Sequence, residues 1–141
     1  MEFGKLVMMG KPRVYLETSV VSYLTARPSR DVVVVGHQQI TRDWWQTRRG
    51  SYHLVASQLV VQEANAGDEK AAQARLELLD EVELIETKEA ALNLSRELVE
   101  RGPLPESAAA DALHIAIAVT TGVDYLLTWN CRHLISNLGH G

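Results

Sequence analysis

The sequence predicts an α/β protein, a three-layer α/β/α sandwich built on a central, mostly parallel sheet. Short apolar runs rich in β-branched and aromatic residues alternate along the chain with segments of strong helix formers. No internal repeat or low-complexity linker interrupts this alternation. Strands separated by helices throughout are typical of a parallel sheet with helices on both faces.

The chain is predicted to form one domain. We expect residues 1–11 to be a flexible leader and residues 12–141 to share one core, since 141 residues with 46% hydrophobic content suit one domain. No stretch is apolar enough to span a bilayer, and the opening segment lacks the features of a secretory signal. A single cysteine, Cys131, cannot form an internal disulfide, which agrees with a reducing compartment. The predicted location is the cytoplasm.

The first strand and helix follow from local signals. Residues 14–16 form an apolar run with β-branched and aromatic members, which predicts a strand. Thr18 and Ser19 are good helix N-caps, so a helix should begin there and end near Pro28.

A longer helix and the second strand come next. Asp31 can start a helix that continues to Gly50, although the valines at residues 32–35 make its first half ambiguous. Residues 52–57 are then a strand, and residues 58–66 continue as a short helix.

The same alternation continues after a turn at Gly67 and Asp68. Residues 69–80 are rich in strong helix formers, and residues 82–86 alternate apolar and acidic side chains as a third strand does. Residues 88–100 make another helix.

Glycine and prolines within residues 101–107 break the pattern. Residues 108–122 are then apolar on nearly every face, which predicts a buried helix that ends at its terminal glycine. Residues 124–129 form the fourth predicted strand, and residues 130–138 a short terminal helix.

Four polar residues stand where a parallel sheet binds its ligands, outside the carboxyl ends of the strands. Glu17 directly follows the first strand, and Glu63 lies on the helix after the second. Asp111 lies in the apolar helix, and Asn130 directly follows the fourth strand.

Asp111 is the most informative of these residues, because small and apolar neighbours surround it and an unpaired charge there would be costly. A helix that begins near Ser107 would also stabilise it through its dipole, so a structural and a functional role are equally supported. Glu63 by itself is a weaker candidate for a functional role, since glutamates on short helices are usually solvated. Glu17 is stronger, because two hydroxyl residues follow it.

Together, three carboxylates and an amide can converge into an all-oxygen site, which suits Mg²⁺ or Mn²⁺ and disfavours zinc. We predict that Glu17, Glu63 and Asp111 are catalytic and that Glu17, Asp111 and Asn130 hold the metal. Ions in such a site activate a water and stabilise the charge that builds on a phosphodiester. The predicted reaction is phosphodiester hydrolysis.

The sequence lacks the motifs of other common catalytic sites. The sequence has no serine-centred elbow and no glycine-rich phosphate loop, and its histidines lack metal-ligand spacing. His114 shares a helix face with Asp111 and could touch the site, but a satisfied core histidine is the favoured interpretation. Four aromatic residues could stack on bases, but core or dimer-interface roles are more common for them: Tyr23, Trp44, Trp45 and Trp129.

The formal net charge of -4 argues against binding nucleic acid by broad electrostatic attraction. It does not exclude a metal-dependent nuclease, because a site built from carboxylates is negative until it takes up cations. Five arginines between the first two strands form either a solvated helical face or an RNA-contacting patch: Arg27, Arg30, Arg42, Arg48 and Arg49.

Four motifs in register carry a family resemblance: LETSVVSYL, SQLVVQEANAG, AAADALHIAIA and DYLLTWNCRHL. Their order and spacing resemble PIN-domain proteins, specifically the VapC-like toxins of type II toxin-antitoxin systems, over residues 12–135. The resemblance implies the PIN fold and an endoribonuclease that depends on Mg²⁺ or Mn²⁺ and cuts RNA, often tRNA or rRNA. It also implies a homodimer, with no membrane association, and a cognate antitoxin whose tail covers the acidic groove and whose other part binds operator DNA.

The resemblance also assigns the site. Glu17 matches the first family acid, Glu63 the second and Asp111 the third. Asn130 occupies a position where many members have another aspartate, and Thr128 is the hydroxyl residue commonly found just before it. With Thr128, the hydroxyls of Thr18 and Ser19 are expected to support the site.

Two departures from the family pattern leave a second hypothesis open. Glutamate at residue 17 is one methylene longer than the usual aspartate, and Asn130 keeps an oxygen but lacks the charge. The alternative to a ribonuclease is therefore a catalytically weak or inactive PIN-fold protein that binds RNA or an antitoxin. A phosphotransfer receiver domain also clusters acids on a parallel sheet, but the paired aspartates and late lysine that it needs are missing.

Overall fold

Four parallel strands form one sheet in the computed structural model, which describes residues 10–102, 105 and 108–130. The strands are β1 (Arg13–Leu16), β2 (His53–Ser57), β3 (Glu83–Ile85) and β4 (Tyr125–Leu127), in the order β3-β2-β1-β4. All four predicted strands are present, and the predicted α/β class with a parallel sheet is confirmed.

Helices fill every connection between the strands. They are α2 (Thr18–Thr25), α3 (Val32–Arg48), the 3₁₀ turn η1 (Arg49–Ser51), α4 (Gln58–Ala64), α5 (Glu69–Leu79), α6 (Glu89–Glu100) and α7 (Ala109–Thr120). Each helix predicted within the described range is found, with bounds that differ by a few residues. Residues 1–9 of the predicted leader, Ser107, and the predicted terminal helix beyond Asn130 lie outside the described residues.

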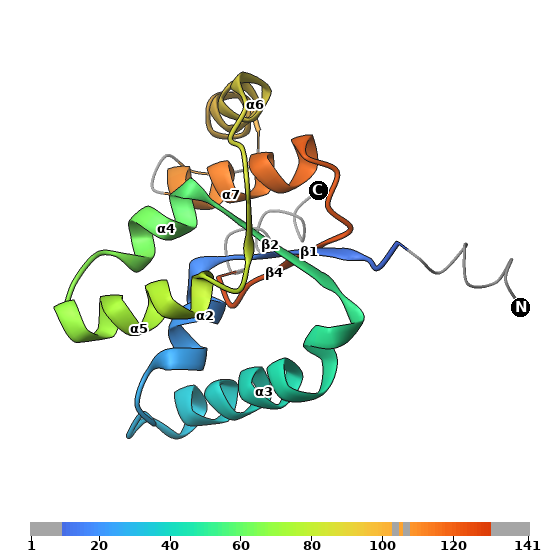
Figure 1. Ribbon diagram of the computed structural model, residues 1–141. Coiled ribbons are helices and arrows are strands. Elements are labelled where there is room, and N and C mark those ends of the chain that lie inside the picture. The colour runs from blue at the N-terminus through green and yellow to red at the C-terminus, as the bar shows by residue number, and fades with distance from the viewer. Residues whose placement is uncertain (1–9, 103–104, 106–107, 131–141) are drawn as a thin grey trace, which may run out of the picture.

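The helices make the outer two layers of a three-layer sandwich. Figure 1 shows α6 and α7 on one side of the sheet and α2, α3 and α5 on the other. The strand order explains this distribution. The chain moves from β1 through β2 to β3 in one direction across the sheet and then returns past β1 to β4. Because crossovers between parallel strands are right-handed, opposite directions place their helices on opposite faces. The direction therefore reverses between β1 and β4, which makes their carboxyl ends a topological switch point.

The core lies on the two inner strands. Tyr15 and Leu16 in β1 and Val55 and Ala56 in β2 are all completely buried, which matches their continuous apolar sequences. The edge strand β3 alternates apolar and acidic residues, and its Leu84 is half exposed. No helix in the described part of the chain is long and apolar enough to cross a membrane.

Capping decides the ambiguous start of α3. The Asp31 carboxylate accepts hydrogen bonds from the backbone N–H groups of Val33 (2.9 Å) and Val34 (3.1 Å). These bonds satisfy two of the free donors of the first turn. Val32 and Val33 are largely exposed, so the valine run gains little from burial that could favour a strand.

Two predictions about helices need correction. The N-cap of α2 is Glu17 and not Thr18 or Ser19, because the Glu17 carboxylate already accepts the Ser19 N–H at 3.1 Å. Helix α7 is not buried on every side: Ala116 and Ile117 are completely buried, while Val119 is 63% exposed. The helix packs against α6 and, through His114 and Ile117, against the sheet, and part of its surface faces solvent.

Candidate metal centre

The candidate site lies at the switch point of the sheet. Glu17 and Thr128 directly follow β1 and β4, and the backbone N–H of Glu17 donates to the Leu127 carbonyl at 3.1 Å. Parallel pairing of the two strands therefore places both residues at the same edge, as the sequence predicts for ligand-binding positions.

The Glu17 carboxylate is buried and held by several donors. Its Oε2 accepts the Ser19 N–H, and its Oε1 accepts the Ser19 hydroxyl and the Thr128 hydroxyl, the latter at 2.6 Å. Ser19 Oγ in turn accepts the Trp129 N–H at 2.9 Å. Hydrogen bonds from both strand ends thus stabilise the anion and fix its orientation.

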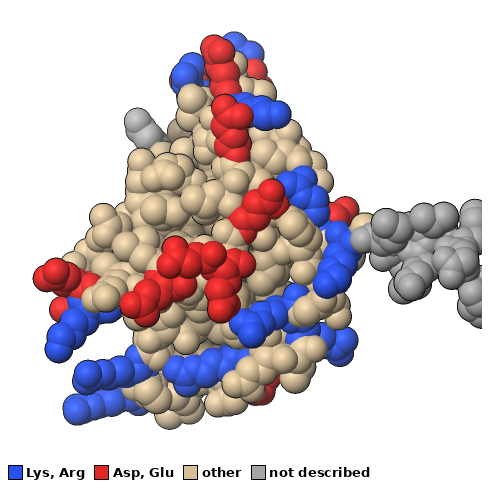
Figure 2. Space-filling view, viewed as in Figure 1, with Lys and Arg blue, Asp and Glu red and all other residues tan. Residues whose placement is uncertain are grey.

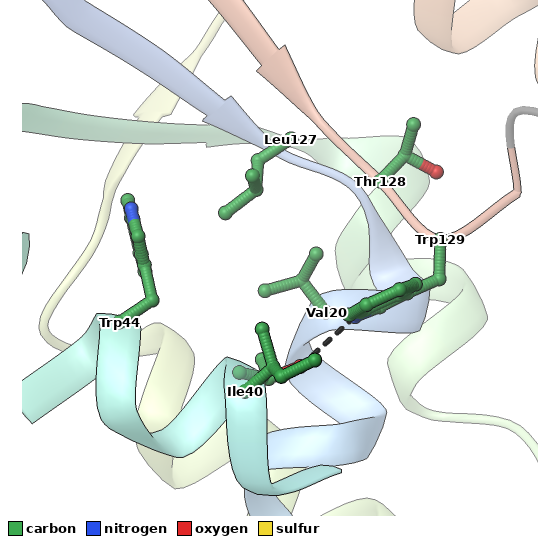
Figure 3. A pocket seen from close by; sticks show the side chains of 7 residues that line it. Val20, Ile40, Trp44, Leu127, Thr128 and Trp129 are labelled. Atoms are coloured by element: carbon green, nitrogen blue, oxygen red, sulfur yellow. Dashed lines mark hydrogen bonds between the residues drawn. The ribbon is translucent and has the colours of Figure 1, made fainter. Parts of the chain in front are cut away.

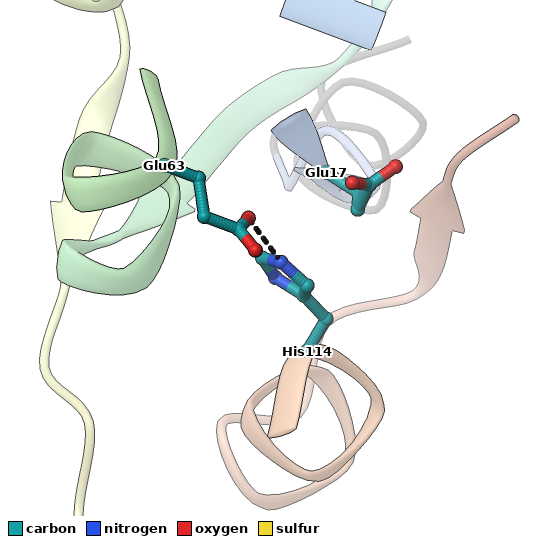
Figure 4. Close-up of side chains that lie close together, drawn as sticks. All are labelled: Glu17, Glu63 and His114. Carbon is teal, nitrogen blue, oxygen red and sulfur yellow. Dashed lines mark hydrogen bonds and ion pairs between the residues drawn. The ribbon is translucent and has the colours of Figure 1, made fainter. Parts of the chain in front are cut away.

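Glu63 reaches the same place from α4. Its Oε1 accepts hydrogen bonds from the Thr18 hydroxyl and from His114 Nε2, the latter at 2.7 Å. Partial burial raises the pKa of Glu63, but these hydrogen bonds and the nearby His114 outweigh burial, so the net effect is a lowered pKa. Figure 4 shows the Glu63 side chain extending to His114 of α7, with Glu17 close by.

His114 contacts the site, a role that the sequence left open but did not favour. It is 2% exposed, and its Nδ1 lies 2.7 Å from the Tyr15 hydroxyl, which is 2.7 Å from Ser57 Oγ. It is therefore the satisfied core histidine that we expected, but it also contacts a predicted catalytic carboxylate. The tyrosine in the first strand could have indicated this contact, because the hydroxyl of a buried tyrosine needs a hydrogen-bond partner.

The residues that come together could hold a divalent ion. One ligand atom each from Glu17, Glu63 and His114 lie within 4.8 Å of one another. Two carboxylates and an imidazole suit Mn²⁺ and related ions, and the carboxylates also suit Mg²⁺. This donor set differs from the all-oxygen set predicted from sequence, because it includes a nitrogen.

The other predicted site residues take different positions. Asp111 is half-buried in the first turn of α7, one helical turn before His114, and lies outside the group of three. Asn130 is exposed, and its backbone N–H donates to Thr128 Oγ1 at 2.8 Å. Of the predicted site residues that the structure describes, Glu17 and Glu63 belong to the group of three and accept hydrogen bonds from Thr18, Ser19 and Thr128, and Asp111 is not a member of that group.

Aromatic packing anchors the loop after β4. Trp129 Nε1 donates to Thr41 Oγ1 at 2.9 Å, and its ring stacks on His37 with centroids 4.1 Å apart. Beside it lies an apolar pocket of about 230 Å³, shown in Figure 3 and lined by Val20, Ile40, Thr41, Trp44, Leu127, Thr128 and Trp129. All three tryptophans are partly buried and pack against the core, as favoured from sequence.

Charges of both signs cover the face seen in Figure 2, with basic side chains gathered near α3 and acidic ones near α5. Of the five arginines between β1 and β2, Arg42 donates to the Ala26 carbonyl at 2.8 Å. Arg49 lies over the Trp45 ring and 3.4 Å from Glu81. These two arginines therefore have structural contacts, while Arg27, Arg30 and Arg48 are exposed.

Comparison with known proteins identifies the fold. No family model and no curated protein matches the sequence. The structure is similar to VapC20 of Mycobacterium tuberculosis, a toxin described as cleaving the sarcin-ricin loop, with a TM-score of 0.65 and 17% identity over 87% of this chain and 94% of that one. It is also similar to VapBC2 of Rickettsia felis bound to a DNA fragment from its promoter, with a TM-score of 0.60 and 17% identity over 85% and 89% of the two chains. The chain thus has the PIN-like fold of the VapC toxins, which confirms the predicted resemblance at the level of fold.

Proposed function

We propose that the protein is a metal-dependent endoribonuclease and the toxin of a type II toxin-antitoxin pair. The observation that carries this proposal is the convergence of Glu17 and Glu63 at the switch point of a sheet with the fold of the VapC toxins. Their oxygens are close enough to share one cation, and they come from segments that are separate in sequence. A cluster of this kind at this position in the fold favours a catalytic site over a solvated surface.

Each residue of the site then has a role. Glu17 and Glu63 would hold a Mg²⁺ or Mn²⁺ ion, with Asp111 and Asn130 as the further ligands predicted from sequence. When bound, such an ion supplies an activated water at neutral pH and stabilises charge on the phosphodiester. Glu63 stays ionised for this purpose because its hydrogen bonds lower its pKa. Thr128 and Ser19 hold the Glu17 carboxylate in place.

The same proposal includes RNA as substrate and a protein partner. VapC20 is described as cleaving the sarcin-ricin loop, and VapBC2 was solved on promoter DNA. We propose an RNA substrate, a homodimer in the cytoplasm, and a cognate antitoxin through which the chain associates with DNA.

A second candidate is a non-catalytic protein that binds RNA or an antitoxin through the same groove. Two observations favour it: both Glu17 oxygens already accept hydrogen bonds, and Asp111 lies outside the group of three. Oε1 of Glu17 accepts two of these bonds, so an ion would have to compete with them for that oxygen.

Cleavage of labelled rRNA and tRNA by the purified protein distinguishes the two candidates. We expect cutting with Mg²⁺ or Mn²⁺, none with EDTA, and a loss on the order of 10²-fold or more in Glu63→Gln and Asp111→Ala. Glu100→Gln is the matched control, since Glu100 is an exposed carboxylate at the end of α6 and should leave the rate unchanged. Failure of the wild-type protein to cut with either metal, while still binding RNA, would favour the binder.

A further inference from the structure

Four side chains form a buried chain of hydrogen bonds that ends on Glu63. Ser57 Oγ lies 2.7 Å from the Tyr15 hydroxyl, Tyr15 lies 2.7 Å from His114 Nδ1, and His114 Nε2 lies 2.7 Å from Glu63 Oε1. The four residues come from β2, β1, α7 and α4, so the chain links two adjacent strands to two helices. Ser57 and Tyr15 are completely buried, and His114 is 2% exposed.

The ionised carboxylate at one end of this chain decides which group donates each hydrogen bond. An ionised carboxylate can only accept, so the nitrogen that faces Glu63, Nε2, must carry a proton. In a neutral imidazole the other nitrogen, Nδ1, then accepts, and the Tyr15 hydroxyl donates to it. Burial raises the pKa of Tyr15, which keeps that proton in place at neutral pH. The Tyr15 oxygen is left to accept from Ser57, and every member of the chain is satisfied.

We propose that His114 is a positioning residue, held by Tyr15 as the Nε2–H tautomer, which orients the Glu63 carboxylate toward a cation shared with Glu17. The inference goes beyond the proposed function by assigning a tautomer and a role to two residues outside the predicted site, and it rests on that function for the identity of the ligand.

The geometry at Glu63 supports this role. Among the described residues, the hydrogen bonds that Glu63 accepts, from Thr18 and His114, both fall on Oε1. Oε2 is thus the oxygen left for a cation, and rotation of the carboxylate would break both bonds. Partners that orient ligand side chains in this way commonly contribute 10-fold to 100-fold in metal affinity.

The alternative is that His114 itself binds the ion through Nε2. That arrangement requires the opposite tautomer, because Nε2 would then be bare and Nδ1–H would donate to Tyr15. The two roles therefore differ in an observable property of the ring.

The first test is the tautomer of His114 in metal-free protein labelled with ¹⁵N at histidine, recorded by NMR at alkaline pH with its signals assigned by their loss in His114→Gln. We expect the Nε2–H tautomer in the wild-type protein and a mixture of tautomers in Tyr15→Phe, which removes only the hydroxyl. The Nδ1–H tautomer in the wild-type protein would overturn the proposal, and so would an unchanged tautomer in Tyr15→Phe.

The second test is Mn²⁺ affinity measured by calorimetry. His114→Met keeps the bulk but has no donor and should bind Mn²⁺ roughly 10-fold to 100-fold more weakly. His114→Gln places an amide N–H near the position of Nε2 and should restore most of the affinity. Unchanged Mn²⁺ affinity in His114→Met would refute a positioning role. So would direct coordination, seen as a hyperfine coupling between bound Mn²⁺ and ¹⁵N-labelled His114 in the electron paramagnetic resonance spectrum. Absence of any Mn²⁺ or Mg²⁺ binding to the wild-type protein would count against the proposed function, and the tautomer measurement would still decide whether the hydrogen-bond chain exists.

Discussion

Replacing Thr128 with valine should destabilise the end of the sheet where the candidate site lies. Valine has nearly the same shape but loses the hydroxyl that donates to Glu17 at 2.6 Å and accepts the Asn130 N–H at 2.8 Å. A hydrogen bond to a charged group contributes about 1.5–3 kcal/mol and an ordinary one about 0.5–1.5 kcal/mol. Water can replace the bond at the exposed Asn130, while buried Glu17 keeps, among the described residues, the donors from Ser19. We therefore expect a loss of about 2 kcal/mol in the free energy of unfolding.

Urea unfolding followed by tryptophan fluorescence in EDTA measures this loss without any contribution from metal binding. Thr128→Ser keeps the hydroxyl and should retain most of the stability. Thr47→Val is the matched control, because the Thr47 hydroxyl bonds to the Asp43 carbonyl on the exposed side of α3 and its loss should change stability by about 0.5 kcal/mol at most. A Thr128→Val protein as stable as Thr47→Val would refute the view that Thr128 holds the Glu17 carboxylate.

Two further predictions concern capping and pH. Asp31→Ala should cost about 1 kcal/mol, because two N–H groups of α3 lose their acceptor, whereas Asp31→Asn should be nearly neutral. Chemical denaturation of the two variants checks this, and equal losses in both would contradict the capping role. Glu63 has a lower pKa in the folded protein than the ordinary value of 4.5, so its ionisation stabilises the fold fully above that pH, and the contribution disappears as the pH falls through the folded value. The stability difference between wild type and Glu63→Gln should therefore shrink as the pH falls below 4.5, and a difference that grows toward acid pH would show that the pKa is raised instead.

The elements of the fold could be predicted because their signals are local. A cap, a proline or a run of apolar residues acts over three or four positions, so the inner strands and most helices could be predicted to within a few residues, while the valine run left the first half of α3 ambiguous. The cap of α2 was assigned to the wrong residue because a carboxylate and two hydroxyls stand in a row, and only the backbone angles decide which one lies outside the helix. The carboxylate of Glu17 takes that place and so serves both the helix and the site.

The site could be predicted only in part. Glu17 stands out because a polar residue at the end of an apolar strand has few structural explanations, and Thr128 was expected from the family resemblance. His114 could not be separated from an ordinary core histidine, because its bond to Glu63 joins residues 51 positions apart. Tyr15 looked like one more apolar strand residue until its hydroxyl was seen between Ser57 and His114.

By itself the sequence determined the α/β class, the alternation of strands and helices, and the two candidate acids Glu17 and Glu63, because each depends on residues that are neighbours in the chain. Only the tertiary structure decided the strand order β3-β2-β1-β4, the partners of those acids and the membership of the cluster. The physical reason is that these features depend on long-range packing: Thr128 meets Glu17 across 111 positions because β4 pairs with β1. The same packing brings His114 of α7 against Glu63 of α4 across 51 positions.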